Sequence, residues 1–417
     1  MFKESTNIFP SQQNIYAWNN LLAKSALFLF GIALWQKGLS FYTYSFSHYL
    51  LLLAWFLDGG LSKLRIMIKE PFVTAILILC SIMALGILWS DDPNHGFRTW
   101  RRYSAFLIFI PYLALLNKNR LHWAIGGILI GYSLVLAMGI YQRFILNAQG
   151  ISPLGLPYLH FSSMLGIGFL STLYLSGIMN NNKIKLSLYF LSIFLLFVQF
   201  HQDARGILIA TIISSIVLIS LMYIKKLKVF FAAIAIFFIL SSIFAYSSSN
   251  FQERTMQAKS NIESLRSGNY DTSLGLRLAW WDVGLHGISE RPLLGHGTGM
   301  AVNYFNKSAE TYKNGLYKNL KKLVHYHNDW IEIGMHIGAL GLITYAYLLW
   351  GWFQILKSHQ LSIPGATLIC FVFLCGITDL LVFFRQIIYL LLVITAIGIC
   401  WHKAQKINSM PTSLQKN

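Results

Sequence analysis

The chain has 417 residues, of which 55% are hydrophobic and only 12% are charged. Soluble proteins carry about 25% charged residues, so this composition excludes an ordinary soluble protein. The net charge of +18 could suit nucleic acid, but in a membrane protein it is typical of loops that face anionic cytoplasmic lipids. We therefore expect membrane lipids as partners and no nucleic acid.

Long apolar runs follow one another along the chain and predict membrane-spanning helices. The clearest are Thr74–Trp89, Ile207–Tyr223, Val229–Tyr246 and Ile387–Trp401, which approach the roughly 20 residues that cross a bilayer. We predict an all-α polytopic membrane protein in which residues 1–417 form a single membrane domain. About twelve spans are expected, at residues 21–37, 40–57, 72–90, 102–116, 121–141, 158–178, 185–200, 205–224, 229–247, 329–353, 363–381 and 384–401.

The N-terminus and the cysteines indicate neither a cleavable signal peptide nor a disulfide framework. A polar N-terminus leads into the apolar runs without a clear small-residue cleavage site. All four cysteines lie inside apolar runs, as small buried side chains do. They are Cys80, Cys370, Cys375 and Cys400.

The basic residues of the short loops predict an orientation with both termini in the cytoplasm. Every loop on that side is then short and basic, with Lys63, Arg65, Lys69, Lys118, Arg120, Lys183, Lys185, Lys225, Lys226, Lys228, Lys357, Lys403 and Lys406. Residues 248–328 break the pattern as one long polar segment on the outer side, between the ninth and tenth spans. Loops of this length usually carry function.

The stretch HQDARG, residues 201–206, opens the eighth span on the outer side. Arg205 adds a guanidinium group to the free N–H groups and dipole of a helix start, which suits an anion such as phosphate. The alternative is an interfacial arginine whose side chain extends to water.

A second outer feature is LGLRLAWWDVGLHGISERPLLGHGTG, residues 274–299. Its spacing predicts an amphipathic helix on the outer leaflet, which ends in a turn-rich loop from Pro292. The N–H groups of GHGTG could cradle an anion, or the glycines could form only a tight turn. Arg277 is either an anion ligand or a solvated charge on the helix.

The third feature is LVHYHNDWIEIGMHIGALG, residues 323–341. If the tenth span begins near His327, then Gly334, Gly338 and Gly341 share its helix face, and a neighbouring helix can approach closely there. A histidine held near water in this way can act as a general base toward a hydroxyl. The alternative is a structural histidine.

The same stretch has a rival interpretation as a metal site. Asp329, Glu332 and His336 fall on another helix face, with His325 one turn before them, and these residue types can ligate metals. Against this, the face is mixed and carries no dense ligand pair. A polar stripe that lines a cavity of the bundle would explain it equally.

Together these motifs resemble the O-antigen ligase/O-antigen polymerase superfamily of bacterial inner membranes. The resemblance rests on Arg205–Gly206 at a span start, on the tryptophan pair and RPLLGHGTG in the long loop, and on HNDWIEIGMHIGALG. It is best between residues 191 and 349. A departure is Ala204, preceded by Asp203, where the family often has a small hydroxyl residue; Asp203 could orient Arg205 or cap the helix.

The resemblance implies an inverting, metal-independent glycosyltransferase with a GT-C-like helical fold. Its donor would be a glycan on undecaprenyl diphosphate and its acceptor lipid A–core, joined in the periplasm, so that residues 248–328 become a large periplasmic loop. By resemblance, Arg205 and Arg277 bind the diphosphate and His327 is the catalytic base. No metal or cofactor is implied. Secondary candidates for phosphate or acceptor binding are Arg101, Arg102, Arg291 and Asn328.

Other functions remain open. Within the superfamily, the acceptor could be another lipid-linked repeat unit, as in an O-antigen polymerase, or a protein, as in a protein O-oligosaccharyltransferase. The short tail after Trp401 favours a ligase or polymerase, and the single large loop favours a ligase. A membrane transporter or flippase is the alternative of another class, although transporters usually show repeats and polar groups at the membrane midplane.

Overall fold

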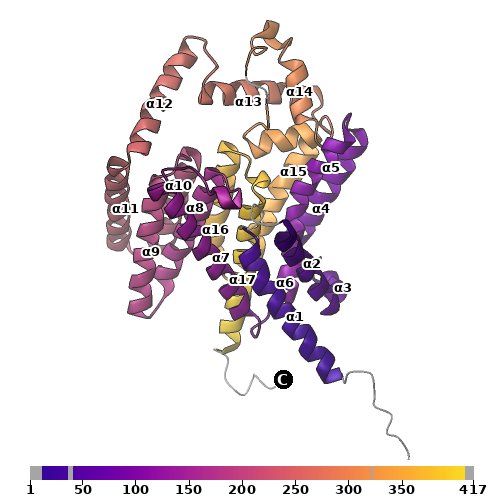
Figure 1. Cartoon of the computed structure of the whole chain (residues 1–417), viewed down its shortest axis with the longest axis vertical. Coiled ribbons are helices and arrows are strands. Elements are labelled where there is room, and N and C mark those ends of the chain that lie inside the picture. Colours follow the sequence, from indigo (N-terminus) through magenta and orange to yellow (C-terminus); the bar gives the residue numbers. More distant parts are fainter. Residues whose placement is uncertain (1–11, 36–40, 321–322, 409–417) are drawn as a thin grey trace, which may run out of the picture.

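The structure is a computed structural model that describes residues 12–35, 41–320 and 323–408 (Figure 1). Across these residues the chain is helical, and the sole β pairing is a bridge between Ile151 and Leu156. The α-helices are α1 (Gln12–Ala33), α2 (Phe41–Leu57), α3 (Gly60–Met67), α4 (Pro71–Leu85), α5 (Pro93–Tyr103), α6 (Phe109–Leu115), α7 (Leu121–Ile140), α8 (Tyr158–Ile178), α9 (Asn182–Phe200), α10 (Arg205–Tyr223), α11 (Leu227–Ser247), α12 (Ser249–Arg266), α13 (Ser273–Glu290), α14 (Ala301–Ser308), α15 (Asp329–Ser358), α16 (Ser362–Thr378) and α17 (Arg385–Asn408).

Eight helical segments in the described part are long and apolar enough to cross a membrane. They are Pro71–Trp89, Leu121–Ile145, Tyr158–Ile178, Asn182–Phe200, Arg205–Tyr223, Leu227–Ser247, Asp329–Ser358 and Arg385–Gln405. Each coincides with a predicted span, and together they confirm an all-α polytopic membrane protein.

The other four predicted spans fall on shorter or divided helices. Residues 21–37 overlap α1 and residues 40–57 overlap α2, while residues 36–40 lie outside the described part. Residues 363–381 overlap α16, which is 17 residues long. Residues 102–116 are divided among α5, the 3₁₀-helix η3 (Ser104–Ile108) and α6. The total of about twelve spans stays a prediction.

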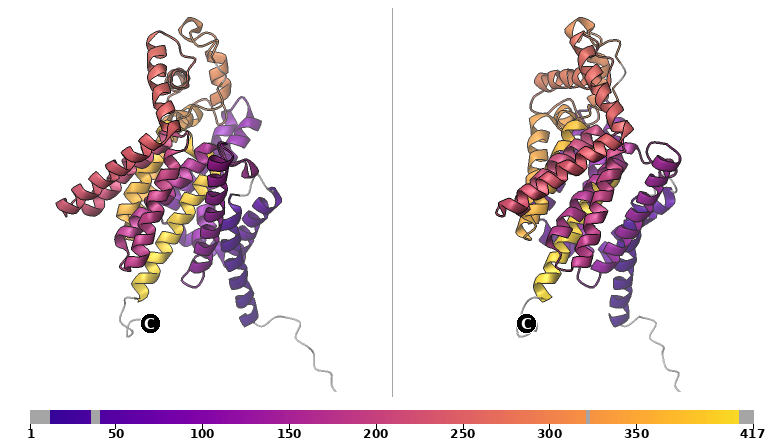
Figure 2. Two further views of the ribbon diagram at one scale, coloured as in Figure 1. Left: turned by 60° about the vertical axis from the view of Figure 1, so that its left-hand side comes forward. Right: turned by 90° about the vertical axis from the view of Figure 1, so that its left-hand side faces the viewer.

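The long polar segment after α11 is mostly helical. Figure 1 shows α12 rising from the end of α11, α13 crossing above the bundle and α14 beyond it. Figure 2 shows these three helices standing at one end of the bundle, while α17 ends at the opposite end. The amphipathic segment expected from Leu274 is confirmed as a helix, α13. Which side of a membrane these helices face stays a prediction.

Helix α15 is broken near its start. At Gly338 the backbone has φ 58° and ψ −149°, after φ −137° at Ile337, and the Gly338 conformation is one that essentially only glycine adopts. In an unbroken helix the N–H groups of Ala339 and Leu340 would donate to the carbonyls four residues earlier. The break therefore frees two N–H groups and two carbonyls.

The segment Pro292–Gly299, here called the wedge loop, takes up all four groups. Two of its N–H groups and two of its carbonyls replace the partners that the broken helix loses, so the backbone at the break stays hydrogen-bonded. The bonds run from His296 N–H to the Met335 carbonyl at 2.9 Å, Gly297 N–H to the His336 carbonyl at 3.0 Å, Ala339 N–H to the Pro292 carbonyl at 2.7 Å and Leu340 N–H to the Leu293 carbonyl at 3.4 Å.

Further contacts fix the wedge loop and α13 in place. Thr298 donates its N–H to the Gly86 carbonyl at 2.9 Å and its hydroxyl to the Met83 carbonyl at 2.7 Å, which ties the loop to the end of α4. A Cβ at Gly284 of α13 would stand 2.5 Å from the Ile331 side chain. Helix α13 therefore packs closely over the first turns of α15.

Replacing Gly338 with alanine should lower the melting temperature of the purified protein in detergent. Alanine is strained at φ 58°, at a cost of about 1–3 kcal/mol, and its Cβ would stand 2.6 Å from the Leu293 carbonyl carbon. Gly126→Ala is the control, because Gly126 lies within α7 and an added Cβ would stand 3.7 Å from the nearest side chain, that of Phe28. Equal melting temperatures for both variants would contradict a structural role of the break.

Candidate functional site

His327 lies just before α15 and not on it. The helix begins at Asp329, and Asn328 is its N-cap: its Oδ1 accepts from the N–H groups two and three residues on, at 2.9 and 3.2 Å. His327 has φ 51°, a left-handed conformation. The prediction that His327 shares a helix face with Gly334 and Gly338 is therefore wrong, and the break at Gly338 would interrupt that face in any case.

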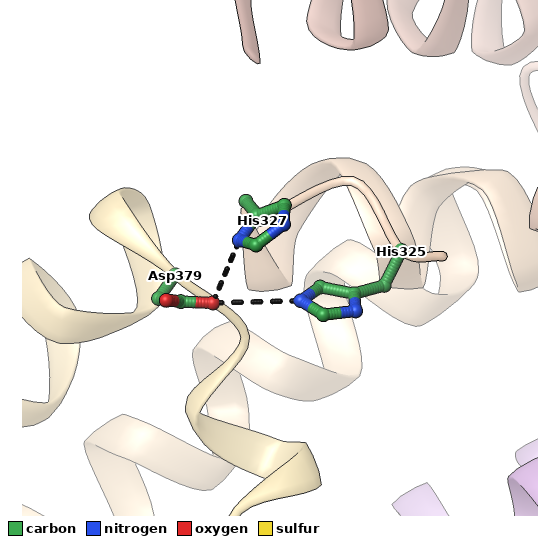
Figure 3. Close-up of side chains that lie close together, drawn as sticks. All are labelled: His325, His327 and Asp379. Carbon is green, nitrogen blue, oxygen red and sulfur yellow. Dashed lines mark hydrogen bonds and ion pairs between the residues drawn. The ribbon is translucent and has the colours of Figure 1, made fainter. Parts of the chain in front are cut away.

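His327 and His325 converge on the carboxylate of Asp379, which directly follows α16 (Figure 3). His327 Nδ1 lies 3.0 Å from Asp379 Oδ1, and His325 Nε2 lies 3.5 Å from the same oxygen. The two imidazole rings are 4.0 Å apart between centroids. The Leu380 N–H also donates to Asp379 Oδ1, at 2.7 Å. We call His325, His327 and Asp379 the His–Asp triad.

The charge state of the triad follows from its surroundings. Burial alone would raise the pKa of Asp379, but contacts with His325 and His327 hold that pKa well below its ordinary value. An ionised carboxylate can only accept, so the Nδ1 of His327 carries the proton and Nε2 keeps its lone pair. Burial lowers the pKa of His327; the Asp379 hydrogen bond opposes this, while His325 and Arg277 add to the lowering. His327 is therefore neutral at neutral pH.

Three arginines, Arg205, Arg254 and Arg277, lie beside the triad, and we call them the arginine cluster. Arg205 is the first residue of α10, and its Nη1 donates to the backbone carbonyl of Arg254 in α12. Arg254 and Arg277 both act electrostatically on Arg205, and Arg277 also acts on His327. Tyr158, at the start of α8, interacts electrostatically with Arg254, Arg277 and Asp379. The structure thus brings Arg205, Arg277 and His327 into one neighbourhood.

Asp203 supports this cluster from the turn between α9 and α10. Its Oδ1 accepts from Arg254 Nε at 3.3 Å and from Asn250 Nδ2 at 3.2 Å, and its Oδ2 accepts from the Gln149 side chain. The N-cap of α10 is Ala204, without a side-chain cap hydrogen bond. The suggestion that Asp203 caps the helix is therefore wrong; it holds Arg254, whose carbonyl holds Arg205.

The wedge loop does not offer its backbone to an anion. Its N–H groups from residue 295 to 299 all donate within the protein, the last to His336 Nδ1 at 3.3 Å. The possibility that GHGTG cradles an anion is thus excluded in this structure. Its glycines at 295, 297 and 299 have φ of 62°, 101° and 92°, which lets the loop pass close to neighbouring backbone.

The secondary candidates lie around the triad in different ways. The Arg102 guanidinium stands 4.0 Å over the Phe383 ring, whose other neighbours include His325 at 5.7 Å between centroids. Arg101 and Arg291 are exposed, and Arg291 stands where α13 ends. Asn328 serves as the cap described above.

The residues considered as metal ligands from the sequence do not gather into one site in the structure. Asp329 is buried and accepts from the Tyr345 hydroxyl at 3.0 Å, whereas Glu332 lies 3.5 Å from His336. The ligand atoms that do gather, within 4.8 Å of one another, are those of the His–Asp triad. Two imidazoles and a carboxylate are suitable donors for a divalent ion, although the adjacent arginine cluster opposes a second positive charge.

Asp379 is a candidate site residue that the sequence analysis did not select, and His325 was considered there only as a metal ligand. A signal was present for Asp379, because it is an isolated carboxylate near the end of the apolar run at residues 363–381. Ionisable residues in such places are usually functional. Its pairing with His327, 52 residues earlier, could not be read from spacing.

Comparison with known proteins gives a family match for the middle of the chain. Residues 190–346 match the family model described as O-antigen ligase. This segment runs from α9 to the second part of α15 and includes Arg205, Arg277 and His327, so this part of the chain is similar to O-antigen ligases. No curated protein sequence matches the chain.

Two substitutions should move the pKa of His327 in opposite directions. Arg277→Gln removes a cation that disfavours the imidazolium, so the pKa should rise; Asp379→Asn removes the carboxylate that favours it, so the pKa should fall. An NMR titration of the histidine side chains would measure both. Arg291→Gln, an exposed arginine at the other end of α13, should leave the pKa unchanged. Shifts of the same sign in the first two variants would contradict this electrostatic account.

Proposed function

We propose that this protein is an O-antigen ligase, which transfers O-antigen polysaccharide from undecaprenyl diphosphate to lipid A–core on the periplasmic face of the bacterial inner membrane. The observation that supports this most is that a half-buried histidine, paired with a buried carboxylate, lies close to an arginine cluster. The first can remove a proton from a hydroxyl, and the second can hold a diphosphate. The match to the family model described as O-antigen ligase supports the proposed class of reaction.

In the proposed reaction, His327 Nε2 takes the proton of an acceptor sugar hydroxyl as its oxygen attacks the anomeric carbon of the donor. The bond from that carbon to the diphosphate oxygen breaks, and undecaprenyl diphosphate leaves with the electron pair. Attack opposite the leaving group inverts the anomeric configuration. Asp379 acts as a positioning residue, because it fixes the tautomer and the orientation of His327.

The arginine cluster would stabilise the leaving group. Negative charge grows on the diphosphate oxygens in the transition state, and fixed cations at that place lower the barrier. Arg205 and Arg277 are held by the protein before substrate binds: Arg205 by the Arg254 carbonyl, and Arg277 by the packing of α13 over α15. In this mechanism the arginines carry the role that a divalent ion plays in many other transferases.

His327→Ala should abolish glycan transfer while the protein still inserts and folds. Loss of a general base reduces rates by about 10²- to 10⁴-fold. The assay uses purified protein in detergent with lipid-linked glycan and acceptor, and a melting curve verifies folding. His286→Ala on α13 is the matched control and should keep its activity, because His286 lies against Tyr312 and Glu290 away from the triad.

The same assay distinguishes an enzyme from a transporter or a flippase. An enzyme works in detergent without a sealed compartment, whereas a transporter or flippase shows activity only across a closed membrane. Full transfer by His327→Ala would refute the assignment of the base. Transfer that disappears on chelation and returns with a divalent ion would show that the reaction needs a metal, for which the His–Asp triad offers the ligand atoms.

Deletion of the gene in its native bacterium should remove all long-chain lipopolysaccharide, while lipid-linked polymer accumulates. Gel electrophoresis of lipopolysaccharide, together with analysis of the lipid-linked pool, would show this. A core that still carries a single repeat unit would indicate an O-antigen polymerase, and unchanged lipopolysaccharide with lost protein glycosylation would indicate a protein O-oligosaccharyltransferase.

A further inference from the structure

We propose that a polar pocket beside Arg205 binds the first sugars of the donor, those next to the diphosphate. The pocket has a volume of about 480 Å³ and lies among residues 143–149 after α7, the turn before α10 and the start of α12. This volume is within the range of roughly 300–1,000 Å³ of small-molecule sites. The inference rests on the proposed function and adds to it a place for the glycan.

The lining of the pocket suits sugar hydroxyls. All of its lining residues are polar or charged, and several are amides, among them Asn147, Asn250 and Gln257. An amide both donates and accepts, as a sugar hydroxyl does. The two arginines, Arg143 and Arg254, are balanced by two carboxylates. A phosphate group would favour an excess of positive charge, so the balance points to neutral sugars.

The pocket lies where a membrane lipid would present its headgroup. The segment Tyr141–Ile145, which contributes to one wall, is the last part of the apolar segment Leu121–Ile145 that is long enough to cross a membrane. It exposes Phe144 and Ile145, while Arg143 and Asn147 line the pocket. Apolar side chains that face lipid, next to polar ones that face a pocket, mark a membrane–water boundary. A lipid-linked substrate can therefore enter from the side.

The pocket is continuous with the arginine cluster. Asp203 and Arg254 both line it, and the backbone carbonyl of Arg254 accepts the hydrogen bond from Arg205. A diphosphate held at Arg205 would place the sugar that it carries against this shared wall. The same wall is fixed by the hydrogen bonds from Arg254 and Asn250 to Asp203, so the pocket is formed before a ligand binds.

The test compares two ligands of the purified protein in detergent: undecaprenyl diphosphate that carries the glycan, and bare undecaprenyl diphosphate. Asn147→Ala and Gln257→Ala should each weaken binding of the glycan-bearing lipid by about two- to tenfold, the effect of one neutral hydrogen bond, and together by about tenfold or more. Binding of the bare lipid should not change. Gln252→Ala is the matched control, because its amide donates to the Tyr246 carbonyl at 2.6 Å and it does not line the pocket.

Other outcomes would overturn the proposal. Equal weakening of both lipids would mean that the pocket acts on the diphosphate, and no change in either would mean that it holds no donor sugar. A rise in KM for the acceptor alone would assign the pocket to lipid A–core. Failure of the proposed function is seen separately, as absence of transfer by the wild-type protein, and the binding comparison does not depend on that transfer.

Discussion

The site depends on the exchange of backbone hydrogen bonds between the broken start of α15 and the wedge loop. Four backbone groups would otherwise lack partners within the protein, and those of the buried Met335 and His336 would each cost about 1–3 kcal/mol. The bonds therefore hold the wedge loop against α15, and with it the end of α13. Because α13 is fixed in this way, Trp280 can stack on the His327 ring, with 5.3 Å between centroids and 11° between planes, and Arg277 is kept near both His327 and Arg205.

The hydrogen bonds of Asp329 impose a second constraint on the position of the triad. Asp329 is fully buried and accepts from the Tyr345 hydroxyl and from the Val382 N–H, at 3.0 and 3.4 Å. It thereby joins the first turn of α15 to the short connection between α16 and α17, where Asp379 lies. A Cβ at Gly376 would be 2.6 Å from this carboxylate, so glycine is needed for the approach. Asp329 thus connects the segment that carries His327 to the segment that carries Asp379, and it helps to fix the distance between these two side chains.

The sequence predicts the helical scaffold well and the site only in part. Apolar runs depend on local composition, so eight predicted spans coincide with long apolar helices. Arg277 could be placed on a helix for the same reason. The left-handed His327 and the break at Gly338 could not be foreseen, because a glycine in an apolar run fits helix packing equally well. The partnership of His327 with Asp379 joins residues 52 positions apart and depends on how α16 and α17 are connected.

The arginine cluster would assist the proposed reaction in two ways: it affects the pKa of His327, and it would stabilise the leaving diphosphate. Before the donor binds, Arg277 helps to keep His327 unprotonated, and the hydrogen bond with Asp379 prevents the pKa of His327 from falling further. A bound diphosphate would offset the charge of the arginines, and a nearby anion raises the pKa of an imidazole. His327 would then become a stronger base only after the leaving group is in place. The same cations would stabilise the departing diphosphate, so that one arrangement of charge would link donor binding to activation of the acceptor.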